Sequence, residues 1–571
     1  MTNMNRLLSS KYGLIFLLVV IVVVNFIASQ WHFSLDLTQE KRYTLSNPTK
    51  RLLRNLDETV NVDVLLQGDM PSGFKKLANS TKELLENFKE AGKNKIRFRF
   101  RKPFENMDDS AKSYFMDSLQ RLGLSPMNVK AQAKEGEGEE QRFIYPGAII
   151  TYKDRITAVD FLQGQSAVNG VNSLNNAEAL LEYKLANAIH KLRVDTVPVI
   201  GYLIGNGEGS YENVYDLVER NIKRNYGFAA LPIDSVPAIP SVFNAIVIVK
   251  PTIKFNDGQK LKIDQYIMHG GKVLWMIDNL YAEMDSLLRS QSEFIAFDRG
   301  LNLEDQLFKY GVRINQDLVQ DLNSDKTPSV VGTVGGKPQI ELLPWPYFPL
   351  LRNYNGHPIA KNLDYVLSQF PNSIDTVKAP GITKTFLLTT SETSRTLNTP
   401  ALVSWNSIKT EEDLKKFNRP FIPIAVLLEG KFNSLFSNRL TNAMKDSLES
   451  IHQPFIAQCE KDNKMIVVAD GDIAANPVTR QDGRLQMGMN PYTKYKYANA
   501  DFVMNAIEYL VDNSGMLELR SKDYTLRLLD KKKLDEEKTQ WQLINIVVPI
   551  LLVIVCGFVY NFVRKRKYQG A

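Results

Sequence analysis

Two long uncharged stretches, one near each end of the chain, limit most strongly what this sequence can fold into. The first, 12–28, reads YGLIFLLVVIVVVNFIA, and the second, 544–563, reads INIVVPILLVIVCGFVYNFV. A helix of about 20 apolar residues is long enough to cross the hydrocarbon core of a membrane. Trp31 follows the first stretch and Trp541 precedes the second, as is typical of membrane interfaces. We therefore expect two transmembrane helices, with a cleaved signal peptide as the alternative for the first.

Basic residues flank both stretches on their outer sides. They are Arg6, Lys11, Arg564, Lys565, Arg566 and Lys567. Because Lys and Arg accumulate on the cytoplasmic side of spans, we expect 1–11 and 564–571 in the cytoplasm and the rest in the periplasm of an inner-membrane protein. These six residues account for most of the formal net charge of +7. The nearly neutral region between the spans argues against nucleic acid and leaves membrane lipid as the expected surface.

The composition indicates a folded chain without metal or disulfide chemistry. At 571 residues it exceeds what one hydrophobic core usually organises, so we expect two or three domains. Cys556 lies inside the second apolar stretch and Cys459 does not, so we expect no disulfide. The five histidines are scattered and none forms the HExxH zinc motif. The sequence therefore predicts no metal site and no cofactor.

The chain after the first apolar stretch alternates between strand-like and helix-like patterns. A strand at 57–66, an amphipathic helix at 73–91 and the strand IRFRFR at 96–101 predict a βαβ unit. Two later runs, YPGAIITY and RITAVDF, predict an antiparallel hairpin beside it, and the acidic segment 133–142 predicts a loop between strands. The expected boundaries are 29–174 for a first periplasmic α/β lobe and 175–195 for a linking helix.

From Val197 onward the pattern is that of a doubly wound α/β lobe. Apolar strands such as VPVIGYLI, FNAIVIVKP and KVLWMID alternate with helices, which indicates a parallel sheet covered on both faces. The runs PFIPIAVLLEG, MIVVADGDI and ADFVMNAIEYLV resume this pattern after a proline-rich stretch. We expect this lobe at 196–515, with an irregular insertion at about 285–400, and then a polar helical stalk at 516–543.

A glycine-rich turn follows the first strand of this lobe. It consists of Gly205, Asn206, Gly207, Glu208 and Gly209. The dinucleotide fingerprint GxGxxG has a different spacing, and here a carboxylate stands where a phosphate would bind. The segment GTVGGKP at 332–338 lacks both the first glycine and the Ser or Thr of a P-loop. We therefore expect no nucleotide site, and we expect the turn either to reverse the chain or to present Glu208 to a ligand or partner.

Three aspartates stand at the ends of predicted strands. Asp278 ends KVLWMID, and Asp470 and Asp472 end IVVADGD. Doubly wound sheets bind ligands at this edge, although aspartates there also cap turns, so the three join the glycine turn as a candidate ligand or partner site. No G-x-S-x-G or G-x-C-x-G nucleophile elbow occurs, so no catalytic residue is predicted. We expect Cys459 to be a structural thiol and His357 a turn or packing residue.

Four segments, taken in order, resemble one known family. They are LDLTQEKRYTLSNPTKRLLRNL, GYLIGNGEGSYE, DQYIMHGGKVLWMID, and VVADGDIAANP with the following NADFVMNAIEYL. Over nearly its whole length the chain resembles the gliding-motility-associated ABC transporter auxiliary proteins of Bacteroidetes, the GldG type. The resemblance implies a substrate-binding or auxiliary component that acts with a separate permease and a separate cytoplasmic ATPase. It also implies a central glutamine-amidotransferase-like fold without the catalytic cysteine.

The predicted fold is an α/β, membrane-anchored ectodomain flanked by two transmembrane helices. It has an N-terminal βαβ, thioredoxin-like lobe and a doubly wound, amidotransferase-like parallel-sheet lobe. The first functional hypothesis is a non-enzymatic ABC-type auxiliary component for gliding motility and cell-surface export, with a periplasmic protein or glycan as its ligand. The alternative is a periplasmic glycan-acting enzyme that uses the strand-end acids. Convergent acids with shifted pKa values would favour the enzyme, and an open polar cleft would favour binding.

Overall fold

The structure is a computed structural model, and it separates the chain into two compact units, Met1–Lys522 and Asp523–Ala571. The first apolar stretch, 12–28, and its flanking residues Arg6 and Lys11 lie outside the described residues, apart from Val19 and Val22. Besides those two valines, the described residues are 44–105, 107–124, 126–131, 140–163, 170–290, 293–405, 407–408, 410–451, 453–512, 514–521 and 531–568.

The described residues of the second unit form one long helix, α14 (Lys531–Tyr568). Its segment Glu537–Arg566 has a mean hydropathy of 2.7 and, among the described residues, is the helix long and apolar enough to cross a membrane. The expected stalk therefore continues into the second apolar stretch without a break from Lys531 onward, because the polar turns before Trp541 are also helical.

A four-stranded sheet with the order β2-β1-β5-β6 lies early in the first unit. Strands β1 (Val60–Val64) and β2 (Ile96–Phe100) are parallel and joined by α4 (Ser72–Ala91), so the expected βαβ unit is confirmed. The expected hairpin is also present, with β5 pairing antiparallel to both β6 and β1. The other elements here are α3 (Asn47–Arg54), α5 (Asp109–Arg121), β3 (Met127–Ala131), β4 (Glu140–Ile144), β5 (Gly147–Tyr152), β6 (Arg155–Asp160) and α6 (Gly170–Arg193).

A seven-stranded sheet with the order β19-β22-β23-β10-β9-β7-β8 organises the rest of this unit. Strands β8, β7, β9, β10 and β23 are parallel, as expected from their apolar runs. The expectation of a parallel sheet is wrong at one edge, where β22 pairs antiparallel with both β23 and β19. The bounds are β7 (Val199–Ile204), β8 (Gly227–Pro232), β9 (Phe243–Val249), β10 (Lys272–Met276), β19 (Ile382–Thr389), β22 (Pro423–Gly430) and β23 (Asn463–Val468).

Both faces of this sheet are covered, as the continuous apolar strands predict. Alternate residues of β9, such as Val247 and Ile248, belong to two different buried clusters, one on each face. The cluster that contains Val247 continues into the core of the four-stranded sheet, through residues such as Val62. Helix α13 (Asn499–Val511) contributes to this first cluster, and α8 (Asp257–Met268) contributes to the second.

The connections between strands show two local features. Helix α8 begins with a capping box, in which Asn256 and Gln259 bind each other's backbone N–H groups. The helix expected after the glycine turn is instead mainly a π-helix, η1. The remaining short elements of this region are η1 (Asp216–Ile222), α7 (Lys223–Asn225), η2 (Leu435–Asn438), α12 (Asn442–Ser450), η3 (Asp472–Ala474), β24 (Val478–Thr479), β25 (Gly483–Arg484) and η4 (Leu517–Ser521).

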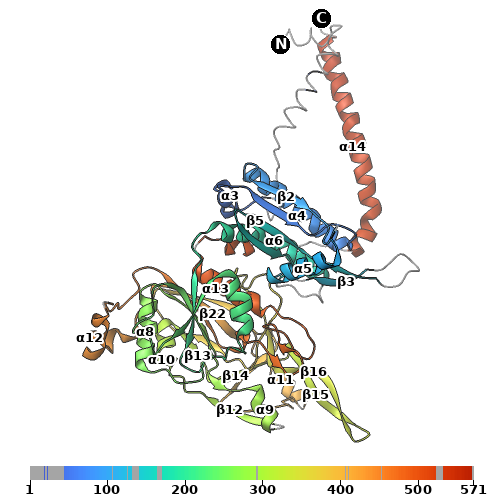
Figure 1. The fold of residues 1–571 in the computed structure, drawn as a ribbon. Coiled ribbons are helices and arrows are strands. Elements are labelled where there is room, and N and C mark those ends of the chain that lie inside the picture. The colour runs from blue at the N-terminus through green and yellow to red at the C-terminus, as the bar shows by residue number, and fades with distance from the viewer. Residues whose placement is uncertain are drawn as a thin grey trace. The chain divides into compact units, whose positions relative to one another are not determined.

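The proline-rich stretch expected to be irregular contains small sheets and a long hairpin, β15 (Ser324–Val334) with β16 (Lys337–Leu351), visible in Figure 1. Strand β16 tolerates prolines such as Pro344 because its second edge pairs only at its last two residues. The other elements are β11 (Leu280–Tyr281), α9 (Met284–Ser290), β12 (Glu293–Asp298), α10 (Glu304–Tyr310), β13 (Val312–Ile314), β14 (Asp317–Asp321), β17 (Val366–Leu367), β18 (Ile374–Thr376), β20 (Ser394–Asn398), β21 (Ala401–Ser404) and α11 (Glu411–Lys415).

Candidate functional site

The carboxyl edge of the seven-stranded sheet brings the three predicted aspartates together. Asp278 follows β10, and Asp470 and Asp472 follow the neighbouring strand β23. One carboxylate oxygen from each of the three lies within 4.8 Å of the others. The parallel pairing of the two strands places both ends at one edge, and this proximity is what the strand-end pattern implied.

A lysine that the sequence reasoning did not select stands among these acids. Lys250 directly follows β9, the other neighbour of β10, and its Nζ lies 2.5 Å from Asp472 Oδ1 and 3.3 Å from Asp278 Oδ2. It also lies 3.7 Å from Oε2 of Glu283, which follows β11. We call Lys250, Asp278, Glu283, Asp470 and Asp472 the edge cluster. The sequence signal that could have identified Lys250 is its position at the end of the apolar strand run FNAIVIVKP, which ends at the same edge of the sheet as the aspartates.

The backbone around the edge cluster is shaped to hold Lys250 close to the β23 loop. Lys250 has a φ of 49°, in the left-handed region that side chains rarely adopt. A Cβ on Gly471 would lie 2.6 Å from Lys250 Cβ, so only glycine fits at that position. Gly471 N also donates a 2.5 Å hydrogen bond to Asp278 Oδ1. The loop after β23 is therefore fixed against the residues that follow β9 and β10.

Asp470 is the most deeply held acid of the edge cluster. Its Oδ2 accepts hydrogen bonds from the Ser368 hydroxyl and from Gln369 N, the latter at 2.8 Å, while its Oδ1 accepts from Asp472 N at 2.7 Å. Its side chain is fully buried. Asp470 therefore fastens the 368–369 segment and its own loop to the edge of the sheet.

Burial and charge oppose each other in the edge cluster. Burial raises the pKa of Asp472 to about 6, and the nearby Lys250 ammonium limits that rise. Burial, with the charges of Asp472 and Asp278, raises the pKa of Asp470 well above its usual range. Burial lowers the pKa of Lys250, but the carboxylates of Asp472, Asp278 and Glu283 outweigh it and raise that pKa overall. Lys250 is therefore a cation that its surroundings hold protonated.

The three aspartates have the ligand type that Mg²⁺ or Ca²⁺ prefers. Lys250 places a positive charge within bonding distance of two of them, where a cation would otherwise neutralise them. Two of the three carboxylates also accept backbone N–H groups, which uses part of their capacity as ligands. The arrangement therefore fits an internally neutralised cluster better than a metal centre.

The glycine turn after β7 faces the loop after β9 at the position where the strand order reverses. Strand β7 lies between β8 and β9, so the crevice at which such sheets usually bind ligands separates the ends of β7 and β9. Here Thr252 N and Ile253 N donate to Asn206 O at 2.9 and 2.8 Å, and Thr252 Oγ1 donates to Gly207 O at 2.9 Å. The two loops are therefore bonded directly to one another across this position.

The geometry of the turn follows its glycines, as expected. Gly205 and Gly207 have φ values of 139° and 69°, and a Cβ on Gly207 would lie 2.2 Å from Thr252 Oγ1. Glu208 bends back, and its Oε2 accepts from Gly205 N at 3.0 Å and Asn206 N at 2.9 Å. Burial raises the pKa of this carboxyl despite those bonds. Among the described contacts, none joins Glu208 to the edge cluster.

An open hollow of about 440 Å³ borders the edge cluster through Glu283. Its lining also includes Thr252 from the loop after β9, together with Arg299 and the aromatic pair Tyr281 and Phe297. The nearly buried Arg299 donates to Glu283 Oε1 at 2.5 Å and to Leu280 O at 2.9 Å. This hollow, rather than the crevice at β7, is the open space next to the charged groups.

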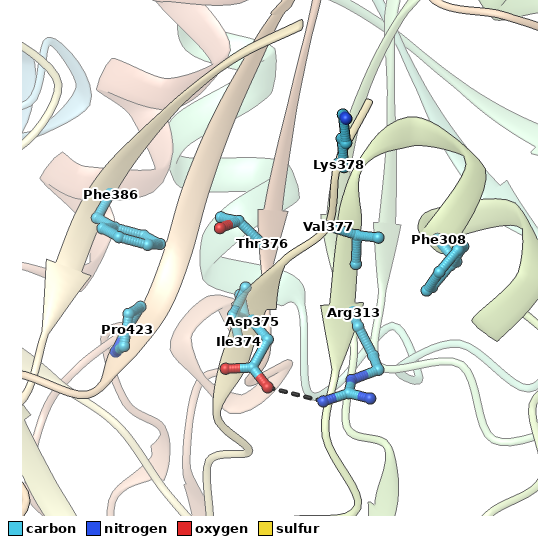
Figure 2. Close-up of a pocket in the computed structure, with 9 residues that line it drawn as sticks. All are labelled: Phe308, Arg313, Ile374, Asp375, Thr376, Val377, Lys378, Phe386 and Pro423. Carbon is cyan, nitrogen blue, oxygen red and sulfur yellow. Dashed lines mark hydrogen bonds and ion pairs between the residues drawn. The ribbon is translucent and has the colours of Figure 1, made fainter. Parts of the chain in front are cut away.

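A larger hollow of about 520 Å³ lies away from the edge cluster, near β13 and β18. Figure 2 shows Arg313 and Asp375 pointing toward one another, with Phe308 and Phe386 on opposite sides of them. The Arg313–Asp375 pair is 2.8 Å apart and about half exposed. Because these charges satisfy each other in solvent, we take the smaller hollow as the candidate site.

The remaining residues singled out from the sequence have structural roles. Cys459 is buried, its thiol contacts Ile267 O, and burial raises its pKa to about 11. The His357 ring lies edge-on to Tyr509, and burial lowers its pKa. The segment 332–338 contains the turn of the β15–β16 hairpin and the strand ends on either side of it. The prediction of a structural thiol and a packing histidine is therefore confirmed.

Comparison with known proteins identifies two matching families. Residues 197–506, more than half of the chain, match the family described as an ABC-type uncharacterized transport system. Residues 39–151 match a domain family of unknown function. A protein of Borreliella burgdorferi described as uncharacterized is 20% identical over 560 residues, which cover 94% of each chain.

Among solved structures, the chain is similar to the mmIFT52 N-terminal domain. The match covers 55% of this chain and 98% of that one, with 12% identity and a TM-score of 0.31, too low to indicate a shared fold or function. The family match extends from the first strand of the seven-stranded sheet into α13 and includes the edge cluster. The chain therefore belongs to the ABC-type uncharacterized transport system family of auxiliary proteins.

Proposed function

We propose that this chain is a membrane-anchored, non-enzymatic auxiliary subunit of an ABC-type transport complex. A separate permease and a separate cytoplasmic ATPase complete the complex, and the described α/β unit acts in the periplasm. Membership of the auxiliary family supports the transport role. The apolar helix within α14 supports anchoring in the membrane. The link to gliding motility and cell-surface export is supported by the resemblance of the four sequence segments.

The observation that carries the non-enzymatic role is the position of Lys250. General acid and base catalysis needs groups that can reach a substrate and exchange protons near the working pH. In the edge cluster, the Asp472 and Asp278 carboxylates both contact the Lys250 ammonium, and Asp278 also accepts a hydrogen bond from Gly471 N. These charges support the loops around the hollow, and the hollow is where a ligand or partner binds.

A periplasmic glycan-acting enzyme is the second candidate. The observation that favours it is Asp472, whose pKa of about 6 is suitable for a proton donor beside other carboxylates. An Asp472→Asn variant would then lose glycan hydrolysis while keeping its partners. Under the auxiliary role, the same variant shows no such loss, because the chain has no hydrolytic activity to remove.

Co-purification from native membranes tests the proposal. The full chain, tagged and expressed in its own host at its natural level, should recover a multi-span permease and an ATPase in a mild detergent. An unrelated membrane protein with the same tag serves as the control. Recovery of the chain without either subunit, under conditions that keep other ABC complexes intact, would contradict the auxiliary role.

A further inference from the structure

The three-stranded sheet β11-β12-β21 has one covered face and one open apolar face. Tyr281 pairs with Phe297, and Ile295 pairs with Leu402, across neighbouring strands. Ile295 and Phe297 are two residues apart in β12, so all four side chains are on one face. The residues between them, such as Ala296, point to the opposite face and are buried in an aromatic-rich core.

The open face is unusually apolar for a surface. The exposed fractions are 41% for Tyr281, 57% for Ile295, 54% for Phe297 and 54% for Leu402. Tyr281 and Phe297 stack with their ring centroids 5.3 Å apart. We call these four residues the apolar face. Scattered exposed apolar residues are ordinary, but adjacent large ones on a regular sheet mark interaction surfaces.

Helix α9 and the smaller hollow continue the apolar face on one side. Figure 1 shows α9 beside β12, and Leu288 of α9 is 58% exposed. Tyr281 and Phe297 also line the hollow of about 440 Å³. The Arg299 guanidinium lies 5.2 Å from the centre of the Tyr281 ring and holds it in place. A flat apolar surface next to a hollow suits a partner that inserts one anchoring side chain.

The charges around the apolar face are mainly negative. Asp285, Glu293 and Asp298 are exposed acids, and Asp298 is hydrogen-bonded by neutral groups, Gln316 Nε2 and Gly300 N. Of the two arginines that line the hollow, Arg299 is already paired with Glu283. Arg289 lies 3.9 Å from Asp285, and both are largely exposed. The rim therefore carries an excess of negative charge.

This charge balance distinguishes among the occupants that an apolar surface could have. A second copy of the chain would place acidic rim against acidic rim, and an anionic lipid surface would also be repelled. A protein segment with apolar side chains flanked by Lys or Arg would satisfy both the apolar face and its rim.

We propose that the apolar face and the adjoining hollow are a docking surface for a segment of another protein subunit that presents apolar side chains flanked by Lys or Arg. This inference rests on the proposed function, because it takes the partner from the same membrane complex. The anchoring side chain enters the hollow beside Tyr281, and the basic flanks face Asp285, Glu293 and Asp298.

Photo-crosslinking in native membranes tests this surface. The full chain would carry benzoylphenylalanine at position 295, or at position 156 as the control. Ile156 is also an isoleucine, is 54% exposed and lies in the four-stranded sheet. We expect an adduct at position 295 in which the crosslinked partner peptide has an apolar residue flanked by Lys or Arg. We expect no such adduct at position 156. Adducts only to a second copy, to lipid or equally at both positions would overturn the proposal.

Two substitutions separate this inference from the proposed function. Ile295→Asp should reduce recovery of the permease and ATPase about tenfold or more, whereas Ile156→Asp should not. Asp285→Lys should lower the crosslinking yield from position 295, because it removes a negative charge from the rim. If both subunits are recovered equally with Ile295→Asp, the docking surface is wrong and the auxiliary role stands. If neither is recovered with the unchanged chain, the auxiliary role itself fails.

Discussion

Replacing Lys250 with methionine tests the view that the edge cluster is neutralised from within. Methionine keeps an unbranched stem and the same Cβ, so the substitution removes mainly the ammonium group. Two unit charges about 4 Å apart attract by about 4 kcal/mol at an effective dielectric constant near 20. The Lys250 ammonium faces three carboxylates at 2.5, 3.3 and 3.7 Å. The cost of removing these groups from water offsets much of that attraction.

Removing one partner from a buried charged group typically costs about 3–5 kcal/mol, because the remaining charges are left uncompensated. We therefore expect Lys250→Met to lower the free energy of unfolding by about that amount at pH 8. Lys254→Met is the matched control, because Lys254 is exposed and lies four residues farther along the same loop. A surface change of this kind should stay within about 0.5 kcal/mol.

The pH dependence of this loss follows from Asp472. Its folded pKa of about 6 lies above the usual 3.8, so the folded state binds the proton more tightly than the unfolded chain. The tighter proton binding by Asp472 therefore stabilises the folded state fully below about pH 4, and this stabilisation is lost as the pH rises through about 6. Without Lys250, the Asp472 pKa rises further, so the deficit of Lys250→Met should be smaller near pH 5, where Asp472 is protonated, than above pH 7.

Guanidinium titrations of the full chain in detergent, followed by tryptophan fluorescence at pH 5 and pH 8, measure both quantities. A deficit no larger than that of Lys254→Met at pH 8 would refute the internal counter-charge. A deficit of equal size at both pH values would refute the role assigned to Asp472.

Three further predictions concern the rest of the chain. Glu508→Ala should lower the free energy of unfolding by about 2–4 kcal/mol in the same titrations, because Glu508 accepts hydrogen bonds from Tyr183, Asn187 and Lys191. The expected loss is moderate because about a third of the Lys191 side chain is exposed, and a loss below about 1 kcal/mol would contradict the prediction. Gly207→Val should lower the free energy of unfolding by more than the about 1–2 kcal/mol that a strained φ costs, because its Cβ would also clash with Thr252. Glu208→Gln keeps an acceptor oxygen and should change the unfolding midpoint little, and the reverse order of the two effects would show that the turn does not serve mainly to reverse the backbone. Neutral residues at 564–567 should disturb insertion of the second span more than folding of the ectodomain, and protease access in spheroplasts that shows both ends outside would contradict the two-span topology.

Local patterns were sufficient to predict much of the central sheet. The apolar runs around Ile200, Val247 and Leu274 became adjacent parallel strands, because continuous apolar residues suit strands buried on both faces. The antiparallel direction of β22 could not be predicted, because its sequence PIAVLLEG is as apolar as those of the parallel strands in the same sheet. The direction of a strand depends on the connection that leads to it, and the connection from β10 to β22 contains the long stretch of small sheets.

The candidate site was predictable in part. The aspartates at 278, 470 and 472 were expected at one edge, and they lie together there. Lys250 and Glu283 were missed, because a charged residue after a strand becomes informative only when the order of the strands is known. The apolar face was missed for a related reason. The alternation in EFIAFD shows two faces of β12, but only the tertiary structure shows which face remains open.

The central claim is that the chain is a non-catalytic subunit whose complex contains a separate ATPase. Steady-state ATP hydrolysis tests it most directly, measured on the complex purified through this chain and on the same chain after its partners are removed. We expect turnover by the complex, its loss when the nucleotide-binding lysine of the partner ATPase is substituted, and no turnover by the separated full chain. ATP hydrolysis by the separated chain at the rate of the complex would contradict the account.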